Sequence, residues 1–258
     1  RYTELYRTDA ETFTPLEPLQ GWIDLIASGI APQEVKVLGI NGGDIAAVEY
    51  RIALALGATA GVIQDTGRAA AKLLADEQWV ASEHLVAMPA DPQTVRAFIG
   101  PGGSRLPDET RERMARAAHD AYRTEQAREQ TFDDPSLREW DRLAPSLQHS
   151  NRLQADHIET KLRQIGCEVA LVGDHAPAPF EFTDGEVEIL GEMEHGRWCA
   201  ERLTGGWVWG DQKDVENRIS PYLVPWSRLP EEIKEYDREA VRKIPELLAS
   251  EGLEILRL

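Results

Sequence analysis

The sequence predicts an α/β Rossmannoid domain with a partial parallel sheet, followed by a mainly α-helical region. Short apolar runs rich in β-branched residues alternate with helical patterns before residue 100. A glycine-rich segment at residues 100–104 then interrupts the chain, and helical patterns dominate after it. The 258 residues are enough for one large domain or two ordinary ones.

The first strand of the predicted sheet covers residues 35–40, an apolar run of the kind that a buried parallel strand requires. The turn Asn41-Gly42-Gly43-Asp44 ends this strand, and Asp44 is a suitable N-cap for a helix over residues 45–56. Gly57 can then end the helix as its C′ residue.

The same alternation continues to the glycine-rich segment. Two more strands and two more helices are expected at residues 59–63 and 84–88, and at residues 68–77 and 92–99. Asp91 caps the last of these helices, and Pro92 occupies its first position. Three strands make a thin sheet, so either a strand near residues 2–6 and a helix near residues 19–27 extend it, or its remainder precedes this chain, which begins with Arg1 and is expected to be part of a longer protein.

Composition excludes several classes of function. Lys and Arg total 28 against 45 Asp and Glu, a net charge of −17, which argues against binding a nucleic-acid polymer or an anionic membrane surface. No apolar run is long enough to span a bilayer. Cys167 and Cys199 form no disulfide framework or zinc-ligand pattern, so we expect no metal or cofactor. No targeting segment is visible, so we expect a cytoplasmic protein.

The glycine turn after the first strand is a candidate anion site, because backbone N–H groups at a helix N-terminus attract phosphate. Asn41-Gly42-Gly43, followed by Glu49 and by residues 51–58, resembles the SLOG/LOG-like superfamily of Rossmannoid proteins. The resemblance implies that Gly42, Gly43 and Glu49 line a pocket for a nucleotide or a nucleotide sugar.

The resemblance is weaker for catalysis. The hydrolytic members of the superfamily carry a Gly-Thr pair where this chain has Ile45 and Ala46, and the chain lacks their upstream glycine-rich loop. These departures favour binding over hydrolysis. Glu49 could equally be a solvated helix residue.

The end of the chain carries the most specific motifs. They are Glu194-His195-Gly196-Arg197-Trp198, Gly206-Trp207-Val208-Trp209-Gly210, and Pro221-Tyr222-Leu223-Val224-Pro225-Trp226. Together with Leu229-Pro230-Glu231, Tyr236-Asp237-Arg238 and Gly252, they closely resemble the ryanodine-receptor (RyR) repeat, a small helical domain. The resemblance covers residues 183–258.

Local signals in this segment predict two helices. Thr183 and Glu186 form a capping box, so one helix should begin at Asp184 and run to about Leu203. Pro230 should occupy the first position of the last helix, which Pro245 kinks and Gly252 ends. Its buried face should comprise Ile233, Tyr236, Ile244, Leu247 and Leu248.

An internal repeat suggests a second, degenerate copy of the RyR repeat. Trp140-Asp141-Arg142-Leu143 aligns with Trp226-Ser227-Arg228-Leu229 at an offset of 86 residues, and His119 with His195 at an offset of 76. The domains expected are therefore a SLOG-like domain over 1–104, a degenerate repeat over 105–170, a connector over 171–182 and a full repeat over 183–258.

The repeat predicts a candidate ligand site. If the two copies pack with approximate two-fold symmetry, Tyr122 and Trp198 face each other and can clamp a flat base by stacking. The candidate residues in this region are these two aromatics, His119 and His195, and the cationic Arg197, Arg152 and Arg238, which could meet a phosphate. Alternatively, His195, Cys199, Trp207, Trp209 and Trp226 belong to a small core.

Three functions remain open from sequence. The first is a sensor module of a bacterial regulatory or defence protein that binds a nucleotide-like molecule of the ADP-ribose, ATP or cyclic-nucleotide class and acts on an effector outside this chain. The second is a LOG-like hydrolase that cleaves a nucleotide N-glycosidic bond with Glu49. The third is a protein-interaction scaffold without a small ligand. The resemblances favour the first.

Overall fold

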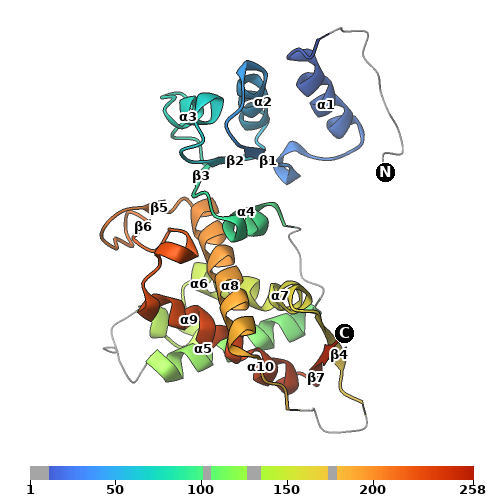
Figure 1. Cartoon of the computed structure of the whole chain (residues 1–258), viewed down its shortest axis with the longest axis vertical. Helices are drawn as coiled ribbons and strands as arrows, with labels where there is room; N and C mark the ends of the chain where they lie inside the picture. Colours follow the sequence, from blue (N-terminus) through green and yellow to red (C-terminus); the bar gives the residue numbers. More distant parts are fainter. Residues whose placement is uncertain (1–11, 101–105, 127–134, 174–178) are drawn as a thin grey trace. The chain divides into compact units, whose positions relative to one another are not determined.

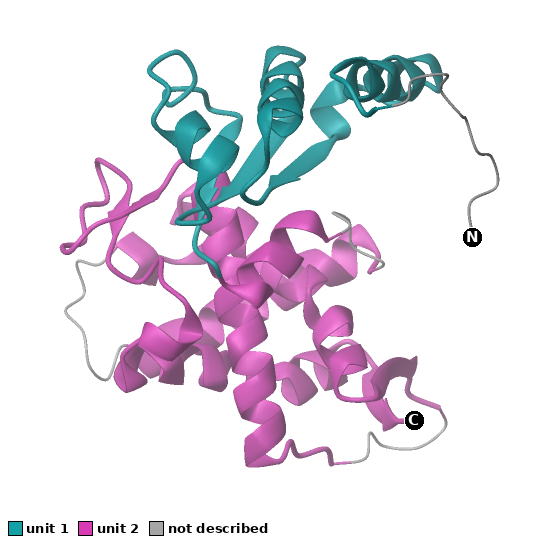
Figure 2. Cartoon of the chain, turned by 45° about the horizontal axis from the view of Figure 1, so that its top comes forward, with its two compact units in different colours: residues 1–90 teal, residues 91–258 magenta. Residues whose placement is uncertain are grey.

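The computed structural model describes residues 12–100, 106–126, 135–173 and 179–258. The chain forms two compact units, residues 1–90 and 91–258, which are described separately (Figure 2). The expected strand near residues 2–6 and the segment 101–104 lie outside the described residues. The chain is mixed α/β with helices predominating, as the sequence predicts.

The first unit contains a parallel sheet with helical crossovers (Figure 1). Its elements are α1 (Leu16–Ala27), η1 (Pro32–Glu34), β1 (Lys36–Gly39), α2 (Asp44–Ala55), β2 (Thr59–Ile63), α3 (Arg68–Leu74) and β3 (Leu85–Met88). The strand order β1-β2-β3 and the parallel pairing follow from the expected βαβ alternation. Tyr50, Leu54, Val62 and Leu73 pack between α2, α3 and the sheet.

One expectation for the first unit needs correction. Gly43, not Asp44, is the N-cap of α2, and Asp44 is the first helical residue, where its negative charge interacts favourably with the helix dipole.

The first compact unit ends at Ala90, and the domain boundary expected at residue 104 lies outside the described residues. Helix α4 (Pro92–Ile99) follows β3 in the chain but belongs to the second unit, where it packs on the helix over residues 184–204.

Besides α4, the second unit contains two helical halves, each with a long helix, a 3-10 helix, two further helices and a strand in this order. The earlier half comprises α5 (Asp108–Gln126), η2 (Pro135–Leu137), η3 (Trp140–Arg142), α6 (Pro145–Asp156), α7 (Ile158–Gln164) and β4 (Cys167–Leu171). The later half comprises α8 (Asp184–Thr204), β5 (Val208–Trp209), β6 (Ile219–Ser220), η4 (Trp226–Arg228), α9 (Glu231–Arg242), α10 (Ile244–Ser250) and β7 (Leu253–Arg257).

A single core joins these halves. Met114, Ile158 and Leu162 of the earlier half pack in one cluster with Leu190 and Leu248 of the later half. Strands β4 and β7, which sequence reasoning missed, pair antiparallel. Neither half therefore buries its apolar face independently of the other.

The last helix differs from the prediction. Pro230 is the N-cap of α9 rather than its first residue, and the helical pattern breaks at Lys243 into α9 and α10. Pro245 lies in the first turn of α10, where its missing N–H removes no helical hydrogen bond, so it begins a helix instead of kinking one. Tyr236, which was expected to be buried, is 37% exposed. By contrast, the capping box at Thr183 and Glu186 is confirmed.

Candidate ligand-binding site

His195 lies at the centre of the later half. Its Nε2 donates to the carbonyl oxygen of Val224 at 2.8 Å, and its Nδ1 is 3.6 Å from a carboxylate oxygen of Asp237. The thiol of Cys199 is 3.4 Å from Nε2. Burial favours the neutral ring, but the Asp237 and Cys199 contacts outweigh it and raise the pKa of His195 to about 11. His195 is therefore a buried residue held by hydrogen bonds, and its contact with the Asp237 carboxylate was not predicted from sequence.

A second set of contacts fixes the tryptophan that follows. Trp226 Nε1 donates to Glu188 Oε1 at 2.8 Å, and Arg238 Nε donates to Glu188 Oε2 at 2.8 Å. The Arg238 guanidinium also lies over the Trp226 ring, 5.5 Å from its centroid. Arg238 is thus held between a carboxylate and an aromatic face.

The earlier half contains the same contacts at corresponding positions. His119 Nε2 donates to the Arg138 carbonyl oxygen at 2.7 Å, and Trp140 Nε1 donates to Glu112 Oε1 at 3.1 Å. Arg152 Nε donates to Glu112 Oε2 at 2.6 Å, and its guanidinium lies 5.4 Å from the Trp140 centroid. Glu112 was not identified from sequence, although it precedes His119 by the same interval that separates Glu188 from His195.

Arg197 is buried within a network of charged side chains. It donates to Glu194 Oε1 at 2.8 and 3.0 Å and to Glu201 Oε2 at 2.8 Å. Lys161 Nζ is 2.6 Å from Glu194 Oε2, and Ser150 Oγ donates to Glu201 at 2.7 Å. Two buried cations and two carboxylates thus balance each other.

The three arginines that were expected to bind a phosphate already have protein partners. Arg152, Arg197 and Arg238 are each bonded to carboxylates of the protein, and none of the three bonds was predicted. A phosphate at any of them would have to compete with a charge-assisted hydrogen bond already formed.

His157, at the junction of α6 and α7, gives the charge network a pH signature. Its Nδ1 is buried with no hydrogen-bond partner among the described residues. Burial, followed by the cation of Lys161, lowers the pKa of His157 to about 3. The unfolded chain, with the ordinary value of 6.5, therefore binds a proton that the folded state rejects.

We therefore expect acidification from pH 6.5 to 4.5 to lower the free energy of unfolding by about 2 kcal/mol through His157. His157→Leu should remove this part of the pH dependence, whereas His149→Leu, at an exposed position on α6, should not. Urea unfolding at the two pH values measures the difference. Equal pH slopes in the wild type and His157→Leu would contradict this assignment.

A stack of three side chains follows His195 along the chain. The Trp198 ring stacks on His195 at 5.9 Å and 21°. The Arg202 guanidinium lies 5.8 Å from the Trp198 centroid and 5.1 Å from the Trp207 centroid. Trp198, Arg202 and Trp207 are all partly exposed, so the stack reaches the surface.

Among the arginines discussed for this site, Arg202 is the one whose guanidinium could still bind an anionic ligand. The described part of the chain contains no hydrogen bond or ion pair of its guanidinium, and burial lowers the pKa of Arg202. Its spacing of four residues from Trp198 on one helix indicates that the two side chains are neighbours, but not that Arg202 lacks a bonded carboxylate. Tyr122 of α5 is 38% exposed. Trp209, which was expected to be core or loop-anchoring, is 56% exposed.

The glycine turn and Glu49 lie in the first unit. Gly42 adopts φ +82°, and a side chain there would meet Ala46 and the Tyr50 hydroxyl. Glu49 lines a groove of about 460 Å³ whose walls include Phe13, Trp22 and Val37. Neither Gly42 nor Gly43 lines this groove, so the structure does not bring Glu49 together with the glycine turn in one cavity.

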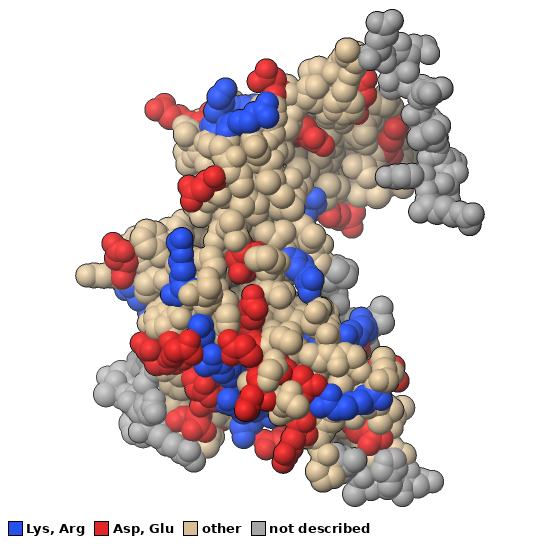
Figure 3. Space-filling model, in the orientation of Figure 1, with Lys and Arg blue, Asp and Glu red and all other residues tan. Residues whose placement is uncertain are grey.

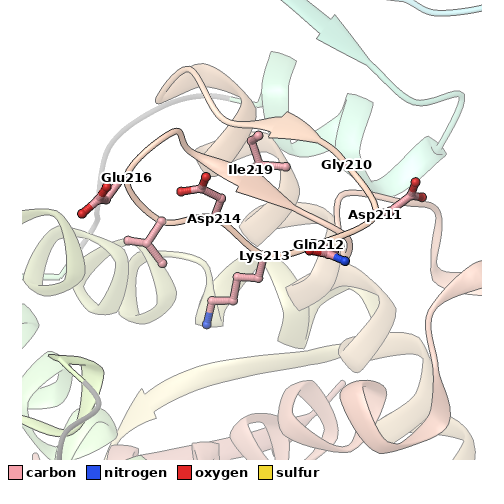
Figure 4. Close-up of a pocket in the computed structure, with 8 residues that line it drawn as sticks. Gly210, Asp211, Gln212, Lys213, Asp214, Glu216 and Ile219 are labelled. Carbon is pink, nitrogen blue, oxygen red and sulfur yellow. The ribbon is translucent and has the colours of Figure 1, made fainter.

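A second cavity of about 510 Å³ lies along the segment between β5 and β6 (Figure 4). Its polar lining consists of Asp211, Gln212, Lys213, Asp214 and Glu216. Asp214 already accepts hydrogen bonds from the Asn217 backbone and side chain, which stabilise the loop. The described residues provide no cluster of His, Cys, Asp and Glu suited to a metal ion.

The surface mixes charges of both signs. Lys and Arg side chains are interspersed with Asp and Glu over the face of the molecule shown in Figure 3. Several cations of the chain are paired with carboxylates, as the Arg113–Glu251 and Arg257–Glu186 contacts illustrate. Within the described ranges, no helix has both the length and the apolar character needed to cross a membrane.

A family model described as RyR domain matches residues 182–257. The match spans α8 to β7, including His195, Trp198, Arg202 and Trp226. The RyR domain predicted from its motifs is therefore confirmed for this segment. The first unit and the helical half that contains α5, α6 and α7 lie outside the match.

Proposed function

We propose that the chain is a sensor module that binds a nucleotide or a nucleotide-derived second messenger within a bacterial regulatory or defence protein. The ligand is of the ADP-ribose, ATP or cyclic-nucleotide class and is bound without chemical change. The observation that carries this proposal is the Trp198–Arg202–Trp207 stack, which offers an aromatic face and a cation that is hydrogen-bonded to no carboxylate in the described chain.

The proposal includes a duplication, in which residues 105–170 are a diverged copy of the RyR repeat. The recurring contacts of His119 and His195 with backbone carbonyls, and of Trp140 and Trp226 with glutamates, support it. The register of β4 and β7 also supports it. Val169 lies opposite Ile255, its counterpart at an offset of 86 residues, as a two-fold axis between the copies requires.

Trp198 supplies the stacking surface for the base, with Tyr122 as the candidate second plane. Arg202 takes the place that Arg152, Arg197 and Arg238 were expected to fill, because their guanidinium groups are already bonded to carboxylates. A guanidinium between two indole rings is held in place while its N–H groups can still meet an anion. The site therefore suits a ligand with a flat base and a negative charge close to it.

Trp198→Ala should weaken nucleotide binding by about 10- to 100-fold, because stacking on one aromatic ring contributes about 1–3 kcal/mol. Arg202→Gln should weaken binding of phosphorylated ligands while sparing the free nucleoside. Trp209→Ala is the matched control, since Trp209 is exposed and outside the stack. Isothermal titration with ADP-ribose, ATP, cyclic AMP and adenosine measures all three variants.

The same titrations separate the alternatives. If none of these ligands binds the wild type, the chain is better explained as a protein-interaction scaffold. Release of free base from a nucleotide, abolished by Glu49→Ala, would instead support the hydrolase. Unchanged affinity in Trp198→Ala would refute the stacking site while leaving nucleotide binding elsewhere intact.

A further inference from the structure

The ion pair between Lys161 and Glu194 joins the two helical halves. Lys161 lies on α7 of the earlier half and Glu194 on α8 of the later half, with Nζ and Oε2 2.6 Å apart. The two side chains are only 2% and 4% exposed. Burying unbalanced charge is costly, so Lys161 depends on the later half for its carboxylate. Glu194, which also bonds to Arg197 on its own helix, depends on the earlier half for its second cation.

The corresponding junction on the other side of the unit is apolar. At the offsets that relate the two halves, Lys161 corresponds to Leu247 and Glu194 to Ala118. Leu247 is buried in the common core, and Ala118 packs against the same cluster. At these two positions, a charged pair at one junction therefore replaces apolar residues at the other.

This difference matters because related halves could pair with themselves. If two later halves from separate chains met across the same two-fold axis, each Glu194 would face a Leu247. If two earlier halves met, each Lys161 would face an Ala118. In a pair of earlier halves each Lys161 would be buried without a carboxylate. In a pair of later halves each Glu194 would keep Arg197 but lose Lys161, so Glu194 and Glu201 would share one cation, whereas the pairing of unlike halves balances these charges.

We propose that the Lys161–Glu194 pair selects the association of unlike halves within one chain and excludes the association of like halves between chains. The proposal rests on the duplication included in the proposed function. A polar pair used in this way contributes specificity rather than stability. It implies that a chain with apolar residues in place of Lys161 and Glu194 would still be stable but would discriminate less between like and unlike halves.

Stability measurements test whether the charges of Lys161 and Glu194 depend on each other. Lys161→Leu and Glu194→Ala install the residues of the apolar junction, and each alone should lower the urea midpoint. The double variant should recover most of the loss, because Arg197 and Glu201 remain as a neutral pair. Losses that simply add in the double variant would overturn the proposal, since the two charges would then be independent.

A cross-linking experiment tests selectivity. Val169 and Ile255 face each other in β4 and β7, so the same axis would place two Ile255 residues face to face in a pair of later halves. A cysteine at position 255, with Cys167 replaced by alanine, should then link two chains only when like halves pair. Val169→Cys with Ile255→Cys is the positive control and should form a bond within one chain.

Chains are unfolded in urea, refolded together at high concentration, oxidised and separated without reductant. With Lys161 and Glu194 present, the Ile255→Cys chain should remain monomeric. In the double variant, the covalent dimer should increase about tenfold or more. An equally small dimer fraction in both backgrounds would overturn the proposal. This readout does not involve nucleotide affinity. A failure of the proposed ligand binding can therefore be distinguished from a failure of this proposal.

Discussion

Replacing Gly196 with alanine should lower the free energy of unfolding of the second unit by about 2 kcal/mol or more. A Cβ at this position would lie 2.5 Å from Gln93 Cβ, 2.6 Å from the Gln93 carbonyl carbon and 2.8 Å from the Thr94 nitrogen. Two of these atoms belong to the backbone of α4, so no side-chain rotation relieves the clash. Helix α4 would have to move away from α8.

Such a movement is costly because the start of α4 is fixed. The Asp91 carboxylate accepts hydrogen bonds from the backbone nitrogen and the hydroxyl of Thr94, both at 2.7 Å, and both residues are buried. Phe98 of the same helix is also buried. Displacing α4 would expose these groups together, which adds to the cost of the added methyl.

Gly185→Ala is the matched control on the same helix. No atom lies within 4 Å of a Cβ at this position. Alanine there should leave stability unchanged or raise it by about 0.5–1 kcal/mol, because glycine is the poorer helix former. Urea denaturation of both variants measures the contrast. A Gly196→Ala variant as stable as the wild type would mean that α4 does not lie against α8 as described.

The close approach at Gly196 also shows where sequence analysis succeeds and fails. The start of α4 could be predicted, because Asp91 and Pro92 are local signals and the cap forms as expected. Its partner could not be predicted, because packing on α8 depends on a glycine about a hundred residues later in the chain. Local signals therefore favour a boundary at the glycine-rich segment, whereas the first compact unit ends at Ala90, before α4.

The later half was predicted more fully because its signals are local or tied to a motif. The capping box appears as expected, and the burial of His195 and Trp226 agrees with the alternative in which they belong to a small core. The strand pair β4–β7 was missed, since each strand is short and its partner comes from the other half. Pairing between distant segments leaves no periodic pattern in either one.

The candidate site shows the same limit. The aromatic Trp198 could be identified from the motif. Whether each arginine is bonded to a carboxylate could not be predicted, because this depends on which carboxylates the fold places beside it. Arg197 is bonded to Glu194 and Glu201, whereas Arg202, five residues later, has no such bond among the described residues. Sequence spacing places both on α8 without deciding which one is free.

Arg197→Leu should be the most destabilising single substitution in the charge network, with a loss of about 3–5 kcal/mol at pH 7. The substitution leaves the buried Glu194 with Lys161 alone and Glu201 with only the Ser150 hydroxyl. Arg197→Lys should recover only part of the loss, because an ammonium cannot reproduce the hydrogen bonds that the guanidinium makes to both carboxylates. Arg163→Leu, at an exposed position on α7 where the partner is Glu159 of the same helix, should change stability by less than about 1 kcal/mol.

The loss should also depend on pH in a defined direction. Burial alone would raise the pKa of Glu194, but Arg197 and Lys161 outweigh it and lower the pKa from 4.5 to about 2. The stability gained from this carboxylate is therefore present above pH 4.5 and is lost as the pH falls towards 2. Removing Arg197 raises the pKa of Glu194 in the folded state, so the difference between wild type and variant should shrink below pH 4.5. Urea unfolding at pH 7 and pH 3.5 measures this change, and a difference independent of pH would mean that Arg197 stabilises the unit through packing rather than through charge.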